Sequence, residues 1–520
     1  MNLGSILVDQ MIMNQLIKFF SRISKDYMNK KKVIIIGGGT AGIVIANRLQ
    51  EKFAVTVIDK SEYKAYPWLY RVPLMIGILF RRKNSEYIHK TEFDLANGRK
   101  IPFYQSNLLG GASVMNGAVH VFGFLSKWIP ILKRFEFEVS DLNESHELLY
   151  SENKVVKNKI TIKKAPLNYI DNSFLETLKI RGIPLDNMSV SEKEACGPIF
   201  NTVRTFFRTS VLSVLSKKKF KTVLNEKVER ILFDEKGNAK GVKTNRSTYD
   251  SDFVVLSAGV MGSCSLLLQQ QLDPNSHIKD LHIGKEIQDH TNLRVNVFAN
   301  HPLNSLNEVY ASFWKKMFLG IKHFLGIPTV MRGTGATSAA YLDLDKDGEI
   351  DTRIQILQFS ESGRHGSKGS VFNTSEPSFS ISINAIHPLS KGYVSYNNGE
   401  LKVDPKFLST EADITLLKLA IKYCIELLKS PPIRDHVKEI DQLDLMEKDP
   451  DKYIQDTMYS GHHLIGGLQN SITSDFELKN CKGLYVCDAS VFDRFVASNI
   501  HSSVVLLADM FAKKFINKQG

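Results

Sequence analysis

Cysteine is scarce in this sequence, and its distribution excludes several kinds of site. The 520 residues contain only five, at positions 196, 264, 424, 481 and 487. No two of them show the C-x-x-C spacing of a zinc or redox site, and an odd, scattered set does not form a disulfide framework. We therefore expect no metal site, and a reducing, cytoplasmic setting for the chain.

A membrane-spanning segment is also missing from the N-terminal region. Residues 1–29 carry apolar side chains at helical spacing, but Asn14 and Gln15 interrupt them, so this stretch is too polar to cross a bilayer. Its charges follow its apolar part, which is not the order of a secretory signal. We interpret residues 1–29 as a loose extension. The alternatives are an interfacial anchor helix that contacts a membrane, or residues upstream of a start at Met28.

Clustered basic sequence is rare, although the formal net charge is +12. Only residues 30–32 and 217–219 form short basic runs, and no aromatic residues are interleaved with them. This favours a solvated basic surface over a nucleic-acid partner. Attraction to the phosphates of a dinucleotide or to an anionic membrane stays compatible with the charge. Low-complexity segments and internal repeats are absent, and the composition is that of a globular protein.

A glycine-rich turn after an apolar run is the first positive signal. The run 33–36 is Val-Ile-Ile-Ile, and Gly37, Gly39 and Gly42 follow it as G-x-G-x-x-G. In this motif Gly37 permits the tight turn and Gly39 lets the backbone approach a pyrophosphate. Gly42 lets the following helix pack on the strand. The N-terminus of that helix then faces the phosphates with its unpaired N–H groups.

The sequence after this turn completes a dinucleotide-binding pattern. A helical pattern begins at Ile43, and a second strand-like run, 54–58, ends in Asp59. A carboxylate at this position accepts hydrogen bonds from a ribose hydroxyl. The N-terminal region therefore predicts a cofactor such as FAD or NAD.

Five further segments resemble, in order along the chain, the motifs of the glucose–methanol–choline (GMC) oxidoreductases. They resemble the family's LGGSSxxNG, AGAxxSP, GxNLQDH, HPxSRGxV and LxVxDASV motifs, and they occupy residues 108–117, 254–263, 283–290, 387–394 and 483–491. With the N-terminal fingerprint and a closing helical run they extend over nearly the whole chain. The resemblance implies an α/β fold with a Rossmann-like FAD-binding lobe. It also implies a second, α+β substrate lobe.

Some positions depart from the family pattern. Cys264 stands where the family has proline, and residues 463–469 match its HxxGTCxMG motif only in part. These departures leave the substrate open. Some relatives tether the flavin through a histidine in the glycine-rich segment, whereas this chain has Ala112 to Met115 there. We therefore expect FAD to be held non-covalently.

The resemblance assigns the reacting side chains to His463 and Asn499. His463 would take the hydroxyl proton while hydride leaves the substrate carbon for flavin N5, and Asn499 would donate a hydrogen bond to the forming alkoxide. His462 would point elsewhere. His501, close to Asn499 in sequence, is the alternative assignment, and we expect it at the surface or behind the reacting groups.

The resemblance also implies a set of cofactor contacts. Thr40 and Ala41 would join Gly39 at the pyrophosphate. The flavin and diphosphate would be contacted by Gly111, Ala112, Asn116, Gly117 and Val119. Val228 would contact the adenine. Asp488 and Ala489 would approach the ribityl chain.

Two local patterns have ordinary structural interpretations. The acidic stretch 343–349 resembles the start of an EF-hand loop, but the twelfth position is Ile354 rather than glutamate, which favours a polar turn. Residues 313–325 place apolar side chains at helical spacing with interspersed lysines. This pattern predicts a core-facing helix, and the alternatives are a lid or a membrane-docking face.

We expect the FAD-binding lobe to comprise three stretches, 30–130, 200–300 and 455–518. Residues 131–199 and 301–454 would form the substrate lobe, with an antiparallel sheet that includes strands near 379–383 and 392–396. The predicted activity is FAD-dependent oxidation of a small-molecule alcohol, with oxygen or another electron acceptor. The alternatives are a flavin-containing lyase of the same fold and a flavin-binding protein without catalysis.

Overall fold

The computed structural model of the chain describes most of its length. The described residues are 30–81, 85–95, 97–188, 190–215, 218–273, 276–361, 374–397, 399–497 and 499–520. The predicted extension, 1–29, lies outside them, as does Lys217 of the second basic run. No helix among these residues is long and apolar enough to cross a membrane.

A five-stranded parallel sheet forms the base of the first lobe. Its central strand is the apolar run before the glycine-rich turn, whose residues 33–36 are fully buried because both faces of the sheet are covered. The strand order is β10 (Lys221–Leu224), β2 (Ala54–Asp59), β1 (Lys32–Ile36), β14 (Phe253–Leu256) and β25 (Leu484–Val486). Stretches far apart in sequence thus build one Rossmann-like sheet.

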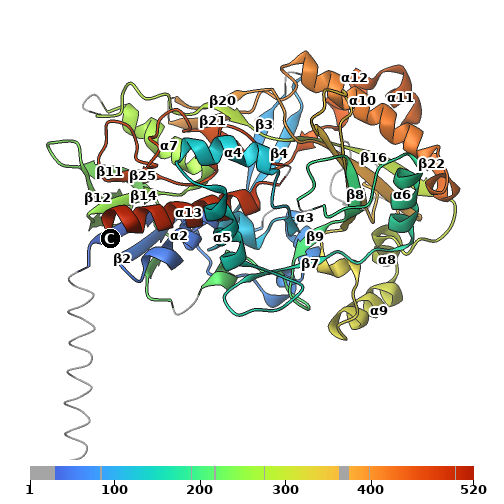
Figure 1. Cartoon of the computed structure of the whole chain (residues 1–520), viewed down its shortest axis with the longest axis horizontal. Coiled ribbons are helices and arrows are strands. Elements are labelled where there is room, and N and C mark those ends of the chain that lie inside the picture. The colour runs from blue at the N-terminus through green and yellow to red at the C-terminus, as the bar shows by residue number, and fades with distance from the viewer. Residues whose placement is uncertain are drawn as a thin grey trace, which may run out of the picture.

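Three helices pack together in this lobe, and one of them is the C-terminal helix (Figure 1). Helix α2 (Thr40–Leu49) packs along the C-terminal helix α13 (His501–Gln519). The Arg48 guanidinium of α2 donates two hydrogen bonds, of 2.5 and 2.8 Å, to the buried carboxylate of Asp509 on α13. Ser145, from α5 (Val139–Leu149), donates to the same carboxylate at 2.8 Å.

A mainly antiparallel, seven-stranded sheet forms the second lobe. It contains β22 (Val437–Ile440), β16 (Thr291–Ala299), β19 (Ser378–Ala385), β18 (Thr352–Leu357), β17 (Ala336–Leu342) and β8 (Ala195–Pro198), with β23 (Tyr459–Ser460) paired to β16. Alternate residues of β16 are fully buried, while those between them are half-buried. This period of two leaves one face of the strand for polar side chains.

The two strands predicted in this lobe are both antiparallel, but they lie in different sheets. The first is part of β19, and the second is β20 (Gly392–Asn397). Strand β20 belongs to a four-stranded sheet with β21 (Glu400–Asp404), β15 (Lys285–Gln288) and β24 (Ile465–Gly467). Strand β16 lies within the 200–300 stretch yet pairs in the seven-stranded sheet. The exact lobe boundaries stay a prediction.

Smaller elements connect and cover these sheets. Two further β units are β3 (Ile88–Asp94) with β4 (Lys100–Ser106), and β11 (Val228–Phe233) with β12 (Ala239–Thr244) and β13 (Thr248–Asp250). A four-stranded unit contains β5 (Val119–His120), β9 (Phe200–Thr202), β7 (Ile160–Lys164) and β6 (Tyr150–Glu152). The other α-helices are α3 (Ile76–Arg81), α4 (Leu125–Arg134), α6 (Tyr169–Ile180), α7 (Gly259–Gln271), α8 (Leu306–Ala311), α9 (Phe313–Phe324), α10 (Glu411–Leu428), α11 (Leu443–Lys448) and α12 (Pro450–Thr457).

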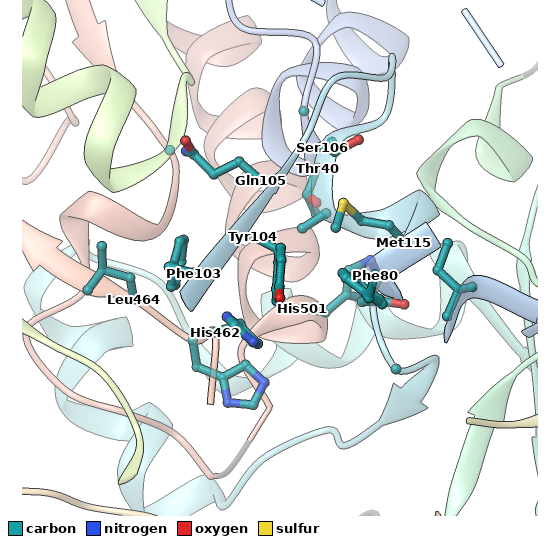
Figure 2. A pocket seen from close by; sticks show the side chains of 18 of the residues that line it. Thr40, Phe80, Phe103, Tyr104, Gln105, Ser106, Met115, His462, Leu464 and His501 are labelled. Atoms are coloured by element: carbon teal, nitrogen blue, oxygen red, sulfur yellow. The ribbon is translucent and has the colours of Figure 1, made fainter. Parts of the chain in front are cut away.

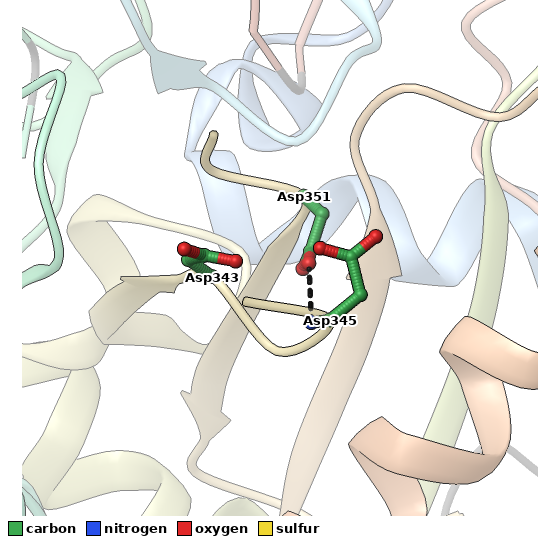
Figure 3. Close-up of side chains that lie close together, drawn as sticks. All are labelled: Asp343, Asp345 and Asp351. Atoms are coloured by element: carbon green, nitrogen blue, oxygen red, sulfur yellow. Dashed lines mark hydrogen bonds between the residues drawn. The ribbon is translucent and has the colours of Figure 1, made fainter. Parts of the chain in front are cut away.

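The acidic stretch that resembles an EF-hand is the loop between β17 and β18. The Asp351 carboxylate accepts backbone N–H groups of Leu344 at 2.8 Å and Asp345 at 3.1 Å, which closes the turn (Figure 3). Asp343 accepts from the Gly348 N–H at 3.0 Å. The carboxylates thus organise a polar turn through backbone hydrogen bonds.

The prediction of a core-facing helix at 313–325 is wrong. Helix α9 covers residues 313–324, with Leu325 as its C-cap, but its only fully buried side chain is His323. Phe313, Trp314 and Phe318 are 68%, 64% and 58% exposed. The prediction of a helix was correct. The spacing of the apolar residues shows that one side of the helix is apolar, but it does not show whether that side faces the core.

Candidate active site

A cavity of about 1430 Å³ connects the glycine-rich turn to the predicted reacting residues. One end is lined by Gly39, Thr40 and Ala41, and the walls farther along include His463 and Asn499. Aromatic side chains of β4 and α3, among them Tyr104 and Phe80, surround its middle part (Figure 2). This volume exceeds that of an ordinary small-molecule pocket and suits a dinucleotide together with a substrate.

All but one of the residues predicted to contact the cofactor line this cavity. The exception is Gly42, on which a Cβ would lie 1.9 Å from the Gly37 carbonyl oxygen. Gly42 thus serves helix-to-strand packing, the role assigned to it from sequence. The lining residues are Gly37, Gly39, Thr40, Ala41, Asp59, Gly111, Ala112, Asn116, Gly117, Val119, Val228, Asp488 and Ala489.

Two glycines leave the space that a pyrophosphate needs. A Cβ on Gly39 would meet no atom within 4 Å, because this residue borders the open cavity at the start of α2. A Cβ on Gly111 would lie 2.8 Å from the Gly39 Cα, so the two glycine-rich segments touch through bare backbone. Both segments thereby expose backbone toward the cavity, as phosphate binding requires.

The two predicted acidic contacts have different surroundings. Asp59 accepts the Gly38 N–H at 2.5 Å and borders the cavity at the end of β2. The buried Asp488 carboxylate accepts hydrogen bonds from the Gly259 N–H at 2.8 Å and the hydroxyls of Ser263 and Ser490. Burial raises the pKa of Asp488. Its carboxylate thus ties the N-terminus of α7 to the chain after β25.

A continuous chain of hydrogen bonds passes through both predicted reacting residues. The Nδ1 atoms of His463 and His290 are 2.9 Å apart, and His290 Nε2 lies 3.0 Å from the Ile386 carbonyl oxygen. On the other side, Asn499 Nδ2 lies 3.0 Å from His463 Nε2. The Arg353 guanidinium donates to Asn499 Oδ1 at 2.8 Å. Residues from five separate segments thus meet at one point.

The ends of this chain determine the direction of every bond in it. The Ile386 carbonyl only accepts, so His290 carries its proton on Nε2 and accepts at Nδ1. His463 must then donate from Nδ1, which leaves its Nε2 as an unprotonated acceptor. Arginine only donates, so the Asn499 carbonyl faces Arg353 and its amide N–H faces His463.

Electrostatics keep both histidines neutral. Burial, followed by the positive charge of Arg353 and the neighbouring His462, lowers the pKa of His463 to about 3. Burial also holds the pKa of His290 well below its usual value. Each histidine uses one ring nitrogen as a donor and the other as an acceptor, and only a neutral ring can do this.

A buried carboxyl group positions the backbone of both histidines. Asp289 Oδ1 accepts the N–H groups of His463 and His290, each at 2.8 Å, while the Ser460 hydroxyl donates to Oδ2. Burial raises the pKa of Asp289 to about 7. The link from β15 to β16 is thereby fixed to the segment between β23 and β24.

The structure adds site residues that sequence reasoning missed. His290 lies in the quoted 283–290 motif but was given no role. Arg353 is buried on β18 between buried Thr352 and Ile354, and a charged residue within an otherwise uncharged strand sequence is the signal that marks it. On the same sheet the Arg294 guanidinium pairs with Glu361 at the cavity wall.

The other two histidines near the site differ from each other. His462 has a left-handed backbone, with φ of 58°, and its ring packs 5.2 Å from that of Phe103 and 5.6 Å from that of Tyr104. His501 lines the cavity at the start of α13, so of the two expected positions, at the surface or behind the reacting groups, the surface position does not hold and the other stays a prediction (Figure 2). Neither ring nitrogen of His501 has a hydrogen-bond partner among the described residues, and burial lowers its pKa to about 4.

Models of the GMC oxidoreductase family match residues 31–292 and 388–508. These segments cover more than half of the chain and contain the glycine-rich turns, His290, His463 and Asn499. The chain belongs to the GMC oxidoreductase family. The motif resemblance, the α/β fold with its antiparallel second lobe, and the FAD cofactor are thereby confirmed.

Several characterised proteins are similar to this GMC oxidoreductase along its length. It is 24% identical to an oxygen-dependent choline dehydrogenase of Vibrio vulnificus, with 94% of each chain covered. It is 22% identical to human mitochondrial choline dehydrogenase, with 92% of this chain and 88% of the other covered.

Solved structures show the same fold. The crystal structure of a pyridoxine 4-oxidase from Mesorbium loti has a TM-score of 0.78 at 18% identity, with 94% of this chain and 99% of the other covered. A variant of Aspergillus oryzae formate oxidase has a TM-score of 0.81 at 17% identity, with the same coverage. At these identities the match defines the fold and leaves the substrate open.

The residues present fit FAD. The open space over Gly39 would receive the pyrophosphate at the start of α2, and Asp59 borders the cavity where a ribose would lie. The partnerless ring nitrogens of His501, at the start of α13, are polar atoms that a bound group would satisfy. The segment 112–115 has no histidine, consistent with non-covalent binding.

Proposed function

We propose that this GMC oxidoreductase oxidises an alcohol, with His463 as the base and Asn499 as the hydrogen-bond donor to the reacting oxygen. The observation that carries the proposal is the pair formed by His463 Nε2 and Asn499 Nδ2. The acceptor and the donor are 3.0 Å apart at the cavity wall. A hydrogen bond to His290 fixes the orientation of the first, and a hydrogen bond from Arg353 fixes that of the second. A hydroxyl group needs this combination, because it gives up a proton while its oxygen gains negative charge.

The polarity of the pair defines the step. A substrate hydroxyl that replaces the hydrogen bond between the two groups donates its proton to His463 Nε2 and accepts the Asn499 N–H on its oxygen. The C–H bond then breaks with its electron pair, and the oxygen forms a carbonyl. FAD, when bound, supplies the acceptor for this hydride. The products are a carbonyl compound, reduced cofactor and one proton on His463.

The surroundings of the pair favour a developing alkoxide. The Arg353 guanidinium places a positive charge one hydrogen bond behind Asn499, which stabilises negative charge on the substrate oxygen. Burial, together with this charge, disfavours the protonated His463 and lowers its pKa to about 3. The negative charge that develops on the substrate oxygen offsets the cost of protonating His463. Because this charge is present only while the alcohol is bound, proton transfer to His463 requires bound substrate.

Anaerobic flavin bleaching tests the proposal. The purified holoprotein is mixed with a panel of primary, secondary, aromatic and amino alcohols, and the oxidised-flavin absorbance is followed. We expect one alcohol class to bleach it, and we expect His463→Ala to slow this bleaching by about 10²- to 10⁴-fold. His462→Ala is the matched control, and its effect should be far smaller because that ring packs on Phe103 and Tyr104.

The outcomes separate the alternatives. A flavin that never bleaches, together with cleavage of a carbon–carbon bond in a substrate, would favour a lyase of the same fold. Near-normal bleaching in His463→Ala would refute the assignment of the base. Absence of any substrate turnover would leave a flavin-binding protein without catalysis.

A further inference from the structure

Helix α9 presents an apolar surface to the outside of the molecule. At 3.6 residues per turn, its six exposed apolar side chains fall within an arc of about 140°. We call this set the α9 face; it consists of Phe313, Trp314, Phe318, Ile321, Phe324 and Leu325. Figure 1 shows α9 projecting from the edge of the molecule, away from the parallel sheet.

The inward side of α9 is held by a polar contact. The buried His323 donates from Nε2 to the Phe206 carbonyl oxygen, at 2.9 Å. Leu319 packs against a buried apolar cluster on the inward side, but most apolar side chains of the helix are exposed, whereas a surface helix of a globular protein turns them inward. Exposure of such a continuous apolar surface marks an interaction site.

A second segment extends this surface. Trp68, on the 3₁₀ turn Trp68–Arg71, is 58% exposed, and its ring lies 6.0 Å from that of Phe324. The neighbouring Leu69 is 38% exposed and lines the cavity, as does Phe324. The α9 face is thus continuous with the mouth of the cavity.

The charges around the α9 face are positive. Lys322 borders its arc on one side and Lys316 on the other, and residues 313–324 contain no acidic side chain. Lys315, on the same side as Lys322, pairs with the buried Glu308 of α8 at 3.2 Å. The whole chain carries a formal net charge of +12. A partner must therefore be both apolar and anionic. A second copy of the chain would bring the same lysines against these, and like charges repel.

We propose that the α9 face binds the surface of an anionic lipid bilayer. A helix with aromatic side chains on one side and flanking lysines lies in the interface, with its apolar side at the acyl boundary and its ammonium groups near the lipid phosphates. The aromatic side chains would enter the headgroup region and the mouth of the cavity would face the lipid. The proposal does not depend on the oxidation proposed above, since it concerns binding alone.

The tryptophans of the chain provide a direct measurement. Of the three, Trp314 and Trp68 lie on this surface, while Trp128 is fully buried. The full-length holoprotein is mixed with vesicles of phosphatidylcholine with 30% phosphatidylglycerol, or of phosphatidylcholine alone, whose acyl chains carry bromine. We expect quenching and co-sedimentation with the anionic vesicles at about 0.1 M salt, and weaker binding at about 0.5 M salt.

Two double variants connect binding to the α9 face. Trp314→Ser with Phe318→Ser should lower the vesicle partition coefficient at least tenfold without changing the melting temperature, because both side chains are exposed. Ile180→Ser with Leu185→Ser removes apolar side chains that are 67% and 57% exposed elsewhere. This control should bind like the unmodified protein.

Three results would overturn the proposal. The first is equal or absent binding to both kinds of vesicle. The second is equal loss of binding in the two double variants. The third is a concentration-dependent dimer, detected by sedimentation velocity, that only the Trp314→Ser, Phe318→Ser variant disperses; the α9 face would then be an interface between copies of the chain.

Discussion

At the scale of single residues, His290 determines the state of His463. Its Nε2 proton is committed to the Ile386 carbonyl, so its Nδ1 offers only a lone pair to His463. This fixes the tautomer in which His463 Nε2 can accept a proton. His290 is therefore a positioning residue, because it acts through His463.

Replacing His290 tests this role. His290→Phe keeps a ring that can stack on Phe495, as His290 does at 3.8 Å, but removes the acceptor for His463. We expect alcohol-dependent flavin reduction to slow by about 10- to 100-fold. His290→Asn, whose carbonyl can accept the His463 Nδ1 proton, should restore part of the rate.

Nitrogen-15 chemical shifts of His463 separate positioning from general damage. The unmodified protein should show a protonated Nδ1 and an unprotonated Nε2, and His290→Phe a mixture of tautomers. A slow variant in which His463 keeps a single tautomer would contradict the positioning role.

At the scale of elements, the turn between β1 and α2 has two glycines with different tasks. Gly39 adopts φ of −80° and ψ of −158°, values that alanine tolerates, and its missing Cβ leaves open cavity. Gly42 lies against the Gly37 carbonyl, so its missing Cβ allows α2 to approach the strand. The motif thus combines a binding requirement with a folding requirement in six residues.

Alanine at each position should separate these requirements. Gly39→Ala should leave the melting temperature of the FAD-free protein unchanged but weaken FAD binding about tenfold or more, because the methyl group occupies the phosphate space. Gly42→Ala should lower the free energy of unfolding by about 1–3 kcal/mol or more through overpacking. Calorimetry and FAD titration of the FAD-free protein measure both. An unchanged FAD affinity in Gly39→Ala would contradict the assignment.

At the scale of the whole molecule, Asp289 lies where the two sheets of the second lobe meet. It follows β15 of the four-stranded sheet and precedes β16 of the seven-stranded sheet. Its carboxyl group also receives the backbone N–H of His463. Its protonation therefore influences the stability of the fold around the site.

The pKa of Asp289 predicts a pH dependence of stability. The folded chain holds this proton up to about pH 7, whereas an unfolded aspartate releases it near pH 4. As the pH rises from about 4 to 7, the unfolded state releases this proton while the folded state keeps it, so the free energy of unfolding falls. Above pH 7 both states have released the proton, and the contribution of Asp289 to the free energy of unfolding is constant. Asp289→Asn removes this contribution. Between pH 5 and 8, the free energy of unfolding of the unmodified protein should fall relative to Asp289→Asn by on the order of 3 kcal/mol.

Urea unfolding of both proteins at several pH values measures this difference. The asparagine can still accept the two backbone N–H groups, so the comparison isolates the ionisable proton. Parallel pH profiles for the two proteins would show that Asp289 is ionised in the folded state at pH 5.

Much of the fold and part of the site could be predicted from local sequence. The β1–α2 turn follows from glycines whose steric freedom is local, and Asp59 follows from the end of the next strand. The position of His463 followed from the spacing of a family motif. The side that α9 presents and the place of His501 could not be predicted, because both depend on which segments pack beside them.

The sequence by itself determined the strand–turn–helix units, the FAD cofactor and the family, since these depend on backbone freedom, periodicity and short motifs. Only the tertiary structure decided the chemistry of the proposed reacting pair. His290 meets His463 across 173 residues, and Arg353 meets Asn499 across 146. A proton position is fixed by the partner on the far side of a ring or amide, and those partners are brought together by folding alone.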